Sequence, residues 1–249
     1  VEEIKRHPDV PNEVRHRLRV RRYLILECKV VLLIGRPQSS HSEVAVHLPL
    51  LPLAKIAVAQ LRNQAAILSD LKHSGARIRH YVPTFYFEGE LAGRPYFVTE
   101  AMRGISVDLP IPPLRRVIEE AADLLIQFHQ DTLVVGTVDD EIFKRLFLAP
   151  LSELSTALGS GIEDLREIEY YLREKVMGQR IPLVWEHGDF YHENLLVDPE
   201  THKITGVLDW EMSRREGLPL LDLLCLFARS EVLFAKKEFP NVFTDKILS

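Results

Sequence analysis

Hydrophobic residues follow two different spacings in the two halves of the chain. In the first half, short runs dense in Val, Ile and Leu are separated by turn-like segments, which is typical of β-strands. In the second half, apolar residues recur every three to four positions over longer stretches, which predicts amphipathic helices. The pattern therefore predicts a strand-rich N-terminal half followed by a mostly helical C-terminal half.

The individual elements and their grouping follow from these patterns. The strands of the first half are predicted at 23–27, 29–34, 43–48, 82–88 and 95–100, with a helix at 53–72. In the second half, helices are predicted at 113–130, 140–149, 162–177 and 218–236, and a hairpin of two short strands at 195–197 and 204–208. The predicted organisation is a helical, basic extension (1–22), a sheet lobe (23–101) and a helical lobe (102–249), with the proline-rich segment 108–113 as connector. This is an α+β architecture, in which the crevice between two lobes is the expected ligand site.

Composition narrows the classes of protein further. The chain has 249 residues, a net charge of −5 and 46% hydrophobic residues, so it is expected to fold and to bind no nucleic acid, which requires a basic face. Its two cysteines lie in apolar runs and predict buried free thiols in a reducing compartment. No apolar run approaches the roughly 20 residues that span a bilayer, so a cytoplasmic protein without a membrane partner is expected. Because the chain begins with valine, it is expected to be trimmed or part of a longer protein, and a fusion to another domain stays open.

The segment 185–222 holds the most informative polar residues. Asp189 and Asn194 flank a tight loop that leads into the strand 195–197, and Asp209 follows the antiparallel partner strand. The hairpin should fold Asp209 beside Asn194, so that their oxygens can share one Mg²⁺, an ion that takes few protein ligands and several phosphate oxygens. Asp189 would then be free to accept a proton from a hydroxyl nucleophile. Taken singly, Asp189 could cap a turn, and Asn194 could be there because its backbone adopts a left-handed conformation. Together with Asp209, the two residues favour the metal site.

The same segment carries a family resemblance. The sequence His-Gly-Asp-Phe-x-x-x-Asn at 187–194, with Asp-Trp at 209–210, resembles the catalytic loop and metal-binding aspartate of the aminoglycoside phosphotransferase and choline kinase family. Three further segments, 93–100, 124–129 and 217–223, are similar to the strand that enters the hinge, a following helix and the start of a later helix. The resemblance covers about residues 23–234.

Membership would imply a two-lobed protein-kinase-like fold and an ATP- and Mg²⁺-dependent transfer of the γ-phosphate to a hydroxyl of a small molecule. Asp189 would be the catalytic base, and Asn194 and Asp209 would hold Mg²⁺. The N-terminal lobe would bind nucleotide, with the backbone around Glu100, Ala101 and Met102 meeting the adenine.

The N-terminal lobe departs from the family pattern. The phosphate-binding lysine of the third strand falls at His47, and the glutamate that tethers it falls at Gln64, a pair that can hydrogen-bond but supplies little charge. Lys55 is the nearest lysine that could substitute, and the turn at 35–42, expected over the phosphates, contains one glycine. Two interpretations follow: an enzyme that binds nucleotide through a modified lobe, or a catalytically weak, pseudokinase-like binding domain.

Several neighbouring polar residues are expected to be structural. His187 should bond nearby backbone, and His129 should be packed at a helix end. Asp222 should brace the catalytic loop or cap its helix, and Glu193 should be exposed. Acidic residues in 163–174 could attract a cationic substrate, although a solvated helix face is the favoured interpretation. The acceptor molecule does not follow from the sequence.

Overall fold

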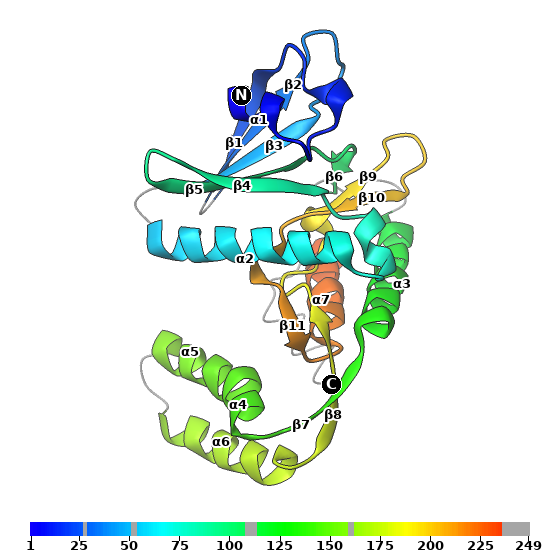
Figure 1. The fold of residues 1–249 in the computed structure, drawn as a ribbon. Helices are drawn as coiled ribbons and strands as arrows, with labels where there is room; N and C mark the ends of the chain where they lie inside the picture. The colour runs from blue at the N-terminus through cyan, green and yellow to red at the C-terminus, as the bar shows by residue number, and fades with distance from the viewer. Residues whose placement is uncertain (27–28, 51–53, 108–113, 159–161, 236–249) are drawn as a thin grey trace.

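The protein forms a sheet lobe above a mostly helical lobe (Figure 1). The structure, a computed structural model, describes residues 1–26, 29–50, 54–107, 114–158 and 162–235. The predicted connector at 108–113 and Cys28 lie outside these residues, and the predicted lobe boundaries stay a prediction. Cys225 is a free thiol, as predicted, but it is partly rather than fully buried.

The N-terminal lobe is built on one antiparallel sheet of five strands in the order β1-β2-β3-β5-β4. Its strands are β1 (Arg19–Ile25), β2 (Lys29–Gly35), β3 (Val44–Pro49), β4 (Phe85–Leu91) and β5 (Arg94–Glu100). All five predicted strands are present, but the first begins four residues earlier than expected. The basic residues at 19–22 therefore belong to an exposed edge strand, where charge discourages pairing with other chains.

Two groups of helical residues cover the sheet. On one side, the N-terminal segment with α1 (Glu2–Arg6) packs Ile4, Val10 and Leu18 against Ile34 and Val44. On the other side, α2 (Ala54–His73) runs between the sheet and the helical lobe (Figure 1). Its buried residues follow the three-to-four-residue spacing of a helix packed on one face: they are Ala57, Leu61, Gln64, Ala65, Ile67, Leu68 and Leu71.

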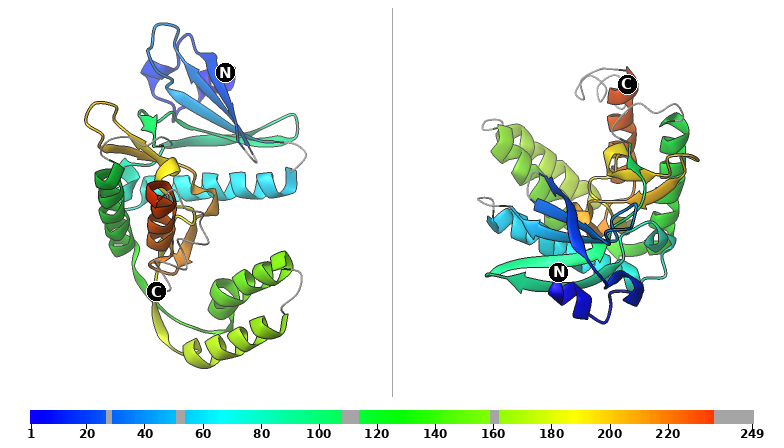
Figure 2. Two further views of the ribbon diagram at one scale, coloured as in Figure 1. Left: turned by 180° about the vertical axis from the view of Figure 1, so that it is seen from behind. Right: turned by 90° about the horizontal axis from the view of Figure 1, so that it is seen from above.

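The C-terminal lobe contains the predicted helices and several strands that were not predicted. The helices are α3 (Leu114–Thr132), α4 (Asp140–Phe143), α5 (Ala149–Leu158), α6 (Ile162–Val176) and α7 (Leu221–Ala235). One small sheet joins β6 (Ile105–Ser106), β9 (Leu195–Val197) and β10 (Ile204–Val207); the other joins β7 (Val134–Thr137), β8 (Arg180–Glu186) and β11 (Arg214–Gly217). The helix predicted at 140–149 is α4 followed by a π-helical turn, Lys144–Leu148, whereas α5, which continues from Ala149 to Leu158, was not predicted. Strands β7 and β8 carry α4, α5 and α6 away from the rest of the lobe (Figures 1 and 2).

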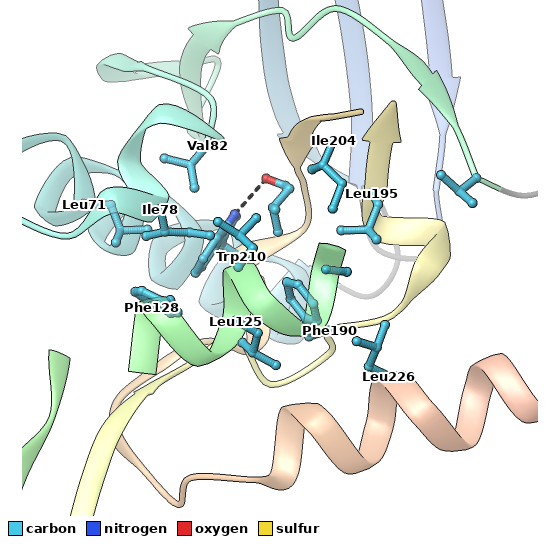
Figure 3. Close-up of a cluster of buried hydrophobic side chains, with 14 of the residues drawn as sticks. Leu71, Ile78, Val82, Leu125, Phe128, Phe190, Leu195, Ile204, Trp210 and Leu226 are labelled. Atoms are coloured by element: carbon cyan, nitrogen blue, oxygen red, sulfur yellow. Dashed lines mark hydrogen bonds between the residues drawn. The ribbon is translucent and has the colours of Figure 1, made fainter. Parts of the chain in front are cut away.

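The main hydrophobic core lies where α2, α3, α7 and the β9–β10 hairpin meet. Trp210, 1% exposed, lies in this core among Leu71, Ile78 and Phe128 (Figure 3). Its indole packs edge-on against the Phe128 ring, with ring centres 5.7 Å apart, and its Nε1–H donates to the Val207 carbonyl over 2.9 Å. The residue that follows Asp209 is therefore anchored in the core of the molecule.

In the described part of the chain, no helix is both long and apolar enough to cross a membrane.

Candidate active site

The loop between β8 and β9 holds Asp189 and Asn194 in contact. The Asn194 side-chain amide, Nδ2, donates to the Asp189 carbonyl oxygen over 2.8 Å and approaches its carboxylate Oδ2 at 3.2 Å. A short 3₁₀ helix, His192–Asn194, closes the loop and leads directly into β9. Because the amide nitrogen faces Asp189, the Asn194 side-chain oxygen is left as an acceptor for a cation.

The hairpin brings Asp209 to the same place. Leu195 pairs with Val207, and the Leu208 N–H donates to the Asn194 carbonyl oxygen over 2.8 Å. Asp209, the next residue after Leu208, therefore lies close to Asn194. Asp209 has φ 64° and ψ 60°, a left-handed conformation that is uncommon for a residue with a side chain and is found at functional sites. The structure thus brings together the three residues predicted from their spacing.

Asp189 is half-buried, and its surroundings make its carboxylate easier to protonate. Burial raises the pKa of its carboxyl, and the charge of Asp209 acts in the same direction, while the bond from Asn194 opposes both. A carboxylate whose pKa lies above its ordinary value has a higher proton affinity, which suits a proton acceptor.

His187 has the structural role predicted for it. Its ring is fully buried, Nδ1 lies 3.3 Å from the Asp189 N–H, and Nε2 lies 2.9 Å from the Leu208 carbonyl oxygen. With Nδ1 as acceptor, Nε2 carries the proton and donates to Leu208. Burial lowers the pKa of the ring, which fits this neutral form. His187 therefore connects the backbone of the Asp189 loop to the backbone that precedes Asp209.

Asp222, at the start of α7, braces the same loop, as predicted. Its carboxylate accepts the N–H groups of His187 and Gly188 over 2.7 and 2.8 Å. His129, buried at the end of α3, lies with Nε2 3.5 Å from the same carboxylate. Glu193 was predicted to be exposed, and its side chain is 56% exposed.

His47 occupies the predicted third-strand position but carries little charge. Its ring stacks on Phe97 with centres 4.2 Å apart, and Nε2 lies 3.3 Å from Thr99 Oγ1. Burial, together with the nearby charge of Lys29, lowers the pKa of His47 to about 3, so the ring is neutral at physiological pH. Gln64 is buried on α2, and its Oε1 accepts a hydrogen bond from Lys29 rather than from His47.

Lys29 is the residue of this region that the sequence analysis missed. It opens β2, its side chain is 7% exposed, and Nζ lies 2.5 Å from Asp209 Oδ1 and 2.7 Å from Glu211 Oε2. A lysine at the beginning of an otherwise apolar strand, one position before Val-Val-Leu-Leu-Ile, was the available signal. Lys55, the substitute considered above, is exposed on the first turn of α2.

The turn expected over the phosphates lies at the wrong end of the sheet. Lys29 at one end of β2 contacts Asp209, whereas Gly35 at the other end pairs with Arg19. A seven-residue strand is about 20 Å long, so the turn at 36–42 is far from Asp209. The expectation that this turn covers the phosphates was wrong because it rested on the composition of the turn and not on the direction in which β2 runs.

The predicted hinge residues lie at the end of β5. Strand β5 ends at Glu100, and the Ala101 N–H donates to the Glu43 carbonyl oxygen over 3.1 Å. Ala101 joins Val31 and Ala45 in a small apolar cluster, and Met102 follows it. Strand alternation places Val31 on the same face of β2 as Lys29, so the apolar cluster and the ammonium lie on one side of the sheet.

The residues present fit Mg²⁺ better than a metal that needs a protein cage. Asp209 and Asn194 supply two hard oxygen donors, and the described residues contain no cluster of three or more His, Cys, Asp or Glu that could hold a metal. Mg²⁺ is commonly held by one or two protein groups together with waters and substrate phosphates.

The fold and the site together define a class of protein. A small antiparallel sheet above a mostly helical lobe, with a catalytic-type Asp-x₄-Asn loop and a hairpin that returns a second aspartate, is the two-lobed protein-kinase-like fold. Within that class, the chain belongs to the phosphotransferase enzyme family, whose family model matches residues 30–238.

Solved structures agree on the fold. An aminoglycoside-3'-phosphotransferase of type VIII is 21% identical with a TM-score of 0.53 over 85% of this chain and 78% of its own. A thermostable mutant of aminoglycoside phosphotransferase APH(4)-Ia is 16% identical, with a TM-score of 0.59 over 90% and 78%. Aminoglycoside phosphotransferase APH(3'')-Id from Streptomyces rimosus, in complex with ADP and streptomycin, is 16% identical, with a TM-score of 0.51 over 89% and 85%. No curated protein matches the chain by sequence.

Proposed function

We propose that the protein is an ATP- and Mg²⁺-dependent phosphotransferase that moves the γ-phosphate to a hydroxyl group of a small molecule. The observation that supports this most is the arrangement of Asp189, Asn194 and Asp209. One hydrogen-bonded loop and one hairpin combine a half-buried carboxylate with two oxygen donors suited to Mg²⁺. The backbone near Glu100, Ala101 and Met102 would meet the adenine, beside the apolar cluster formed with Val31 and Ala45.

In the proposed reaction, the acceptor hydroxyl is oriented by the Asp189 carboxylate, which takes its proton. The hydroxyl oxygen forms a bond to the γ-phosphorus while the bond from that phosphorus to the β–γ bridging oxygen breaks, and ADP leaves. Asn194 and Asp209 would hold Mg²⁺, which, when bound, offsets the negative charge of the phosphates. His187 and Asp222 keep the Asp189 loop in place through its backbone.

Turnover of Mg·ATP in single variants tests this assignment. Asp189→Ala should lower kcat by about 10²- to 10⁴-fold, the usual contribution of a positioned base. Asp209→Ala should raise the Mg²⁺ concentration needed for half-maximal turnover and also abolish most turnover. Asp198→Ala, in the exposed turn between β9 and β10, is the matched control and should keep wild-type turnover. Unchanged turnover in both active-site variants would show that the assignment is wrong.

The acceptor is proposed only as a class. The family and the streptomycin complex of a structural neighbour support a hydroxyl-bearing small molecule. We propose that the protein is cytoplasmic and that neither a nucleic acid nor a membrane is its partner. A screen of aminoglycosides, amino sugars and choline for acceptor-stimulated ADP release would identify the substrate class, and a lack of stimulation by every hydroxyl compound would contradict it.

The neutral His47 favours a second candidate, a catalytically weak kinase-like binding domain. Its low pKa leaves the third-strand position without charge, and Gln64 replaces the expected carboxylate. Two measurements, turnover and thermal unfolding with and without Mg·ATP, separate the two candidates. A ligand that binds only the folded state raises Tm. Stabilisation without turnover would select the second candidate.

A further inference from the structure

Lys29, on β2, forms a largely buried cluster with residues from two other parts of the chain. Its Nζ lies 2.5 Å from Asp209 Oδ1, 2.7 Å from Glu211 Oε2 and 3.2 Å from Gln64 Oε1. The two carboxylates come from the loop after β10, and the amide comes from α2. The three N–H donors of the ammonium therefore face three acceptors.

Lys29 lies on the same face of the sheet as the third-strand residue His47. Lys29 pairs with Pro49, and Val31 pairs with His47, so Lys29 and His47 lie on the same face of neighbouring strands, two residues apart in register. Both side chains also lie on the face that carries the Val31–Ala45–Ala101 cluster. An ammonium on a long, flexible stem can thus approach the same point from β2.

A role in stability alone explains this cluster poorly. Burying an ammonium costs several kcal/mol, and a buried ion pair often contributes no more to stability than apolar residues of the same volume. The cluster also contains two carboxylates for one ammonium, which leaves negative charge beside a proposed Mg²⁺ site.

We propose that Lys29 is the residue that binds the nucleotide phosphates in this chain, in place of the third-strand residue His47, with Gln64 and Glu211 holding its ammonium in position. The inference rests on the proposed function. Under this proposal, Gln64 has the role of the glutamate that holds the phosphate-binding lysine in other kinases. The family match begins at residue 30, one residue after Lys29, so the family comparison itself does not cover this position.

Calorimetric titration of the full chain with adenosine and with ADP tests this role. Adenosine carries no phosphate, so a phosphate-binding residue affects the affinity for ADP alone. Lys29→Met should weaken ADP binding by about 10- to 100-fold, as expected for a lost charge-assisted hydrogen bond, and leave adenosine binding unchanged. Lys55→Met, which removes an exposed lysine from α2, should leave the affinity for both ligands at the wild-type value.

One further measurement and one further variant make a loss of folding distinguishable from a loss of binding. Urea unfolding without ligand establishes that each variant is folded, and Lys29→Gln, which keeps hydrogen bonding but not charge, replaces Lys29→Met if the latter does not fold. Equal ADP affinity in the wild type and the Lys29 variant, or an equal loss for adenosine and ADP, would overturn the inference and leave the proposed function standing. A wild-type chain that binds neither ligand would overturn the proposed function itself, and the role of Lys29 with it.

Discussion

Replacing Asp222 by alanine should destabilise the protein through the catalytic loop. The carboxylate is 1% exposed and accepts two backbone N–H groups, from His187 and Gly188. An acceptor lost from a buried donor costs about 1–3 kcal/mol, which applies in full to the buried His187 N–H, while the bond from Gly188 is part-buried and adds less. Repulsion between Asp222 and Glu186 disappears in the variant, which offsets part of this cost. We therefore expect a loss of about 2–4 kcal/mol, a large share of the roughly 5–15 kcal/mol that stabilises a typical domain.

Urea unfolding followed by far-UV circular dichroism measures this loss. Asp198→Ala is the matched control, since Asp198 also accepts two backbone N–H groups, from Glu200 and Thr201, but in an exposed turn where water can replace it. Asp222→Asn should lie between the wild type and Asp222→Ala, because its single amide oxygen can replace only one of the two carboxylate oxygens that accept the His187 and Gly188 N–H groups. A loss below about 1 kcal/mol for Asp222→Ala, or a loss equal to that of Asp198→Ala, would refute the reasoning.

Two further predictions concern the same loop. Gly188 has φ +85°, and a Cβ there would lie 2.4 Å from the Met212 carbonyl oxygen, so Gly188→Ala should lower Tm more than Gly178→Ala, where φ is +72° but nothing lies within 4 Å. Equal shifts in the two alanine variants would show that the close approach to Met212 is not limiting. Burial, with repulsion from Asp222, raises the pKa of Glu186, so its contribution to stability is present below its ordinary pKa and is lost as pH rises through the raised value. Glu186→Gln should therefore gain stability relative to the wild type as pH rises, and a difference in Tm that does not change with pH would contradict this.

The sequence predicted the parts of the structure that depend on local spacing. Asp189, Asn194 and Asp209 come together through one short loop and one hairpin, and the strand 195–197 lies where the pattern placed it. The grouping of these residues followed from the turn between two short strands. Their proposed roles stay a prediction.

The strands that were missed lack the usual pattern. Val134 and Val135 in β7 are exposed, and β11 consists of Arg-Arg-Glu-Gly, so neither strand alternates between apolar and polar residues. Both form because they pair with β8, a contact between distant segments that no local pattern encodes. The π-helical turn before α5 was missed for a similar reason, because its apolar residues continue the spacing of a helix.

The position of the cation shows a different limit of sequence reasoning. A motif identifies a residue by its position in one strand of the sequence. Binding of a phosphate depends instead on where an ammonium group lies in the folded protein, whichever strand supplies it. Lys29 and His47 lie 18 positions apart in the chain, but the β2–β3 register sets them on one face of adjacent strands. The third-strand position can therefore lose its charge when a neighbouring strand supplies a lysine to the same face. The lack of a lysine at position 47 therefore does not by itself decide between an enzyme and a catalytically weak domain, because Lys29 places an ammonium 2.5 Å from the Asp209 carboxylate.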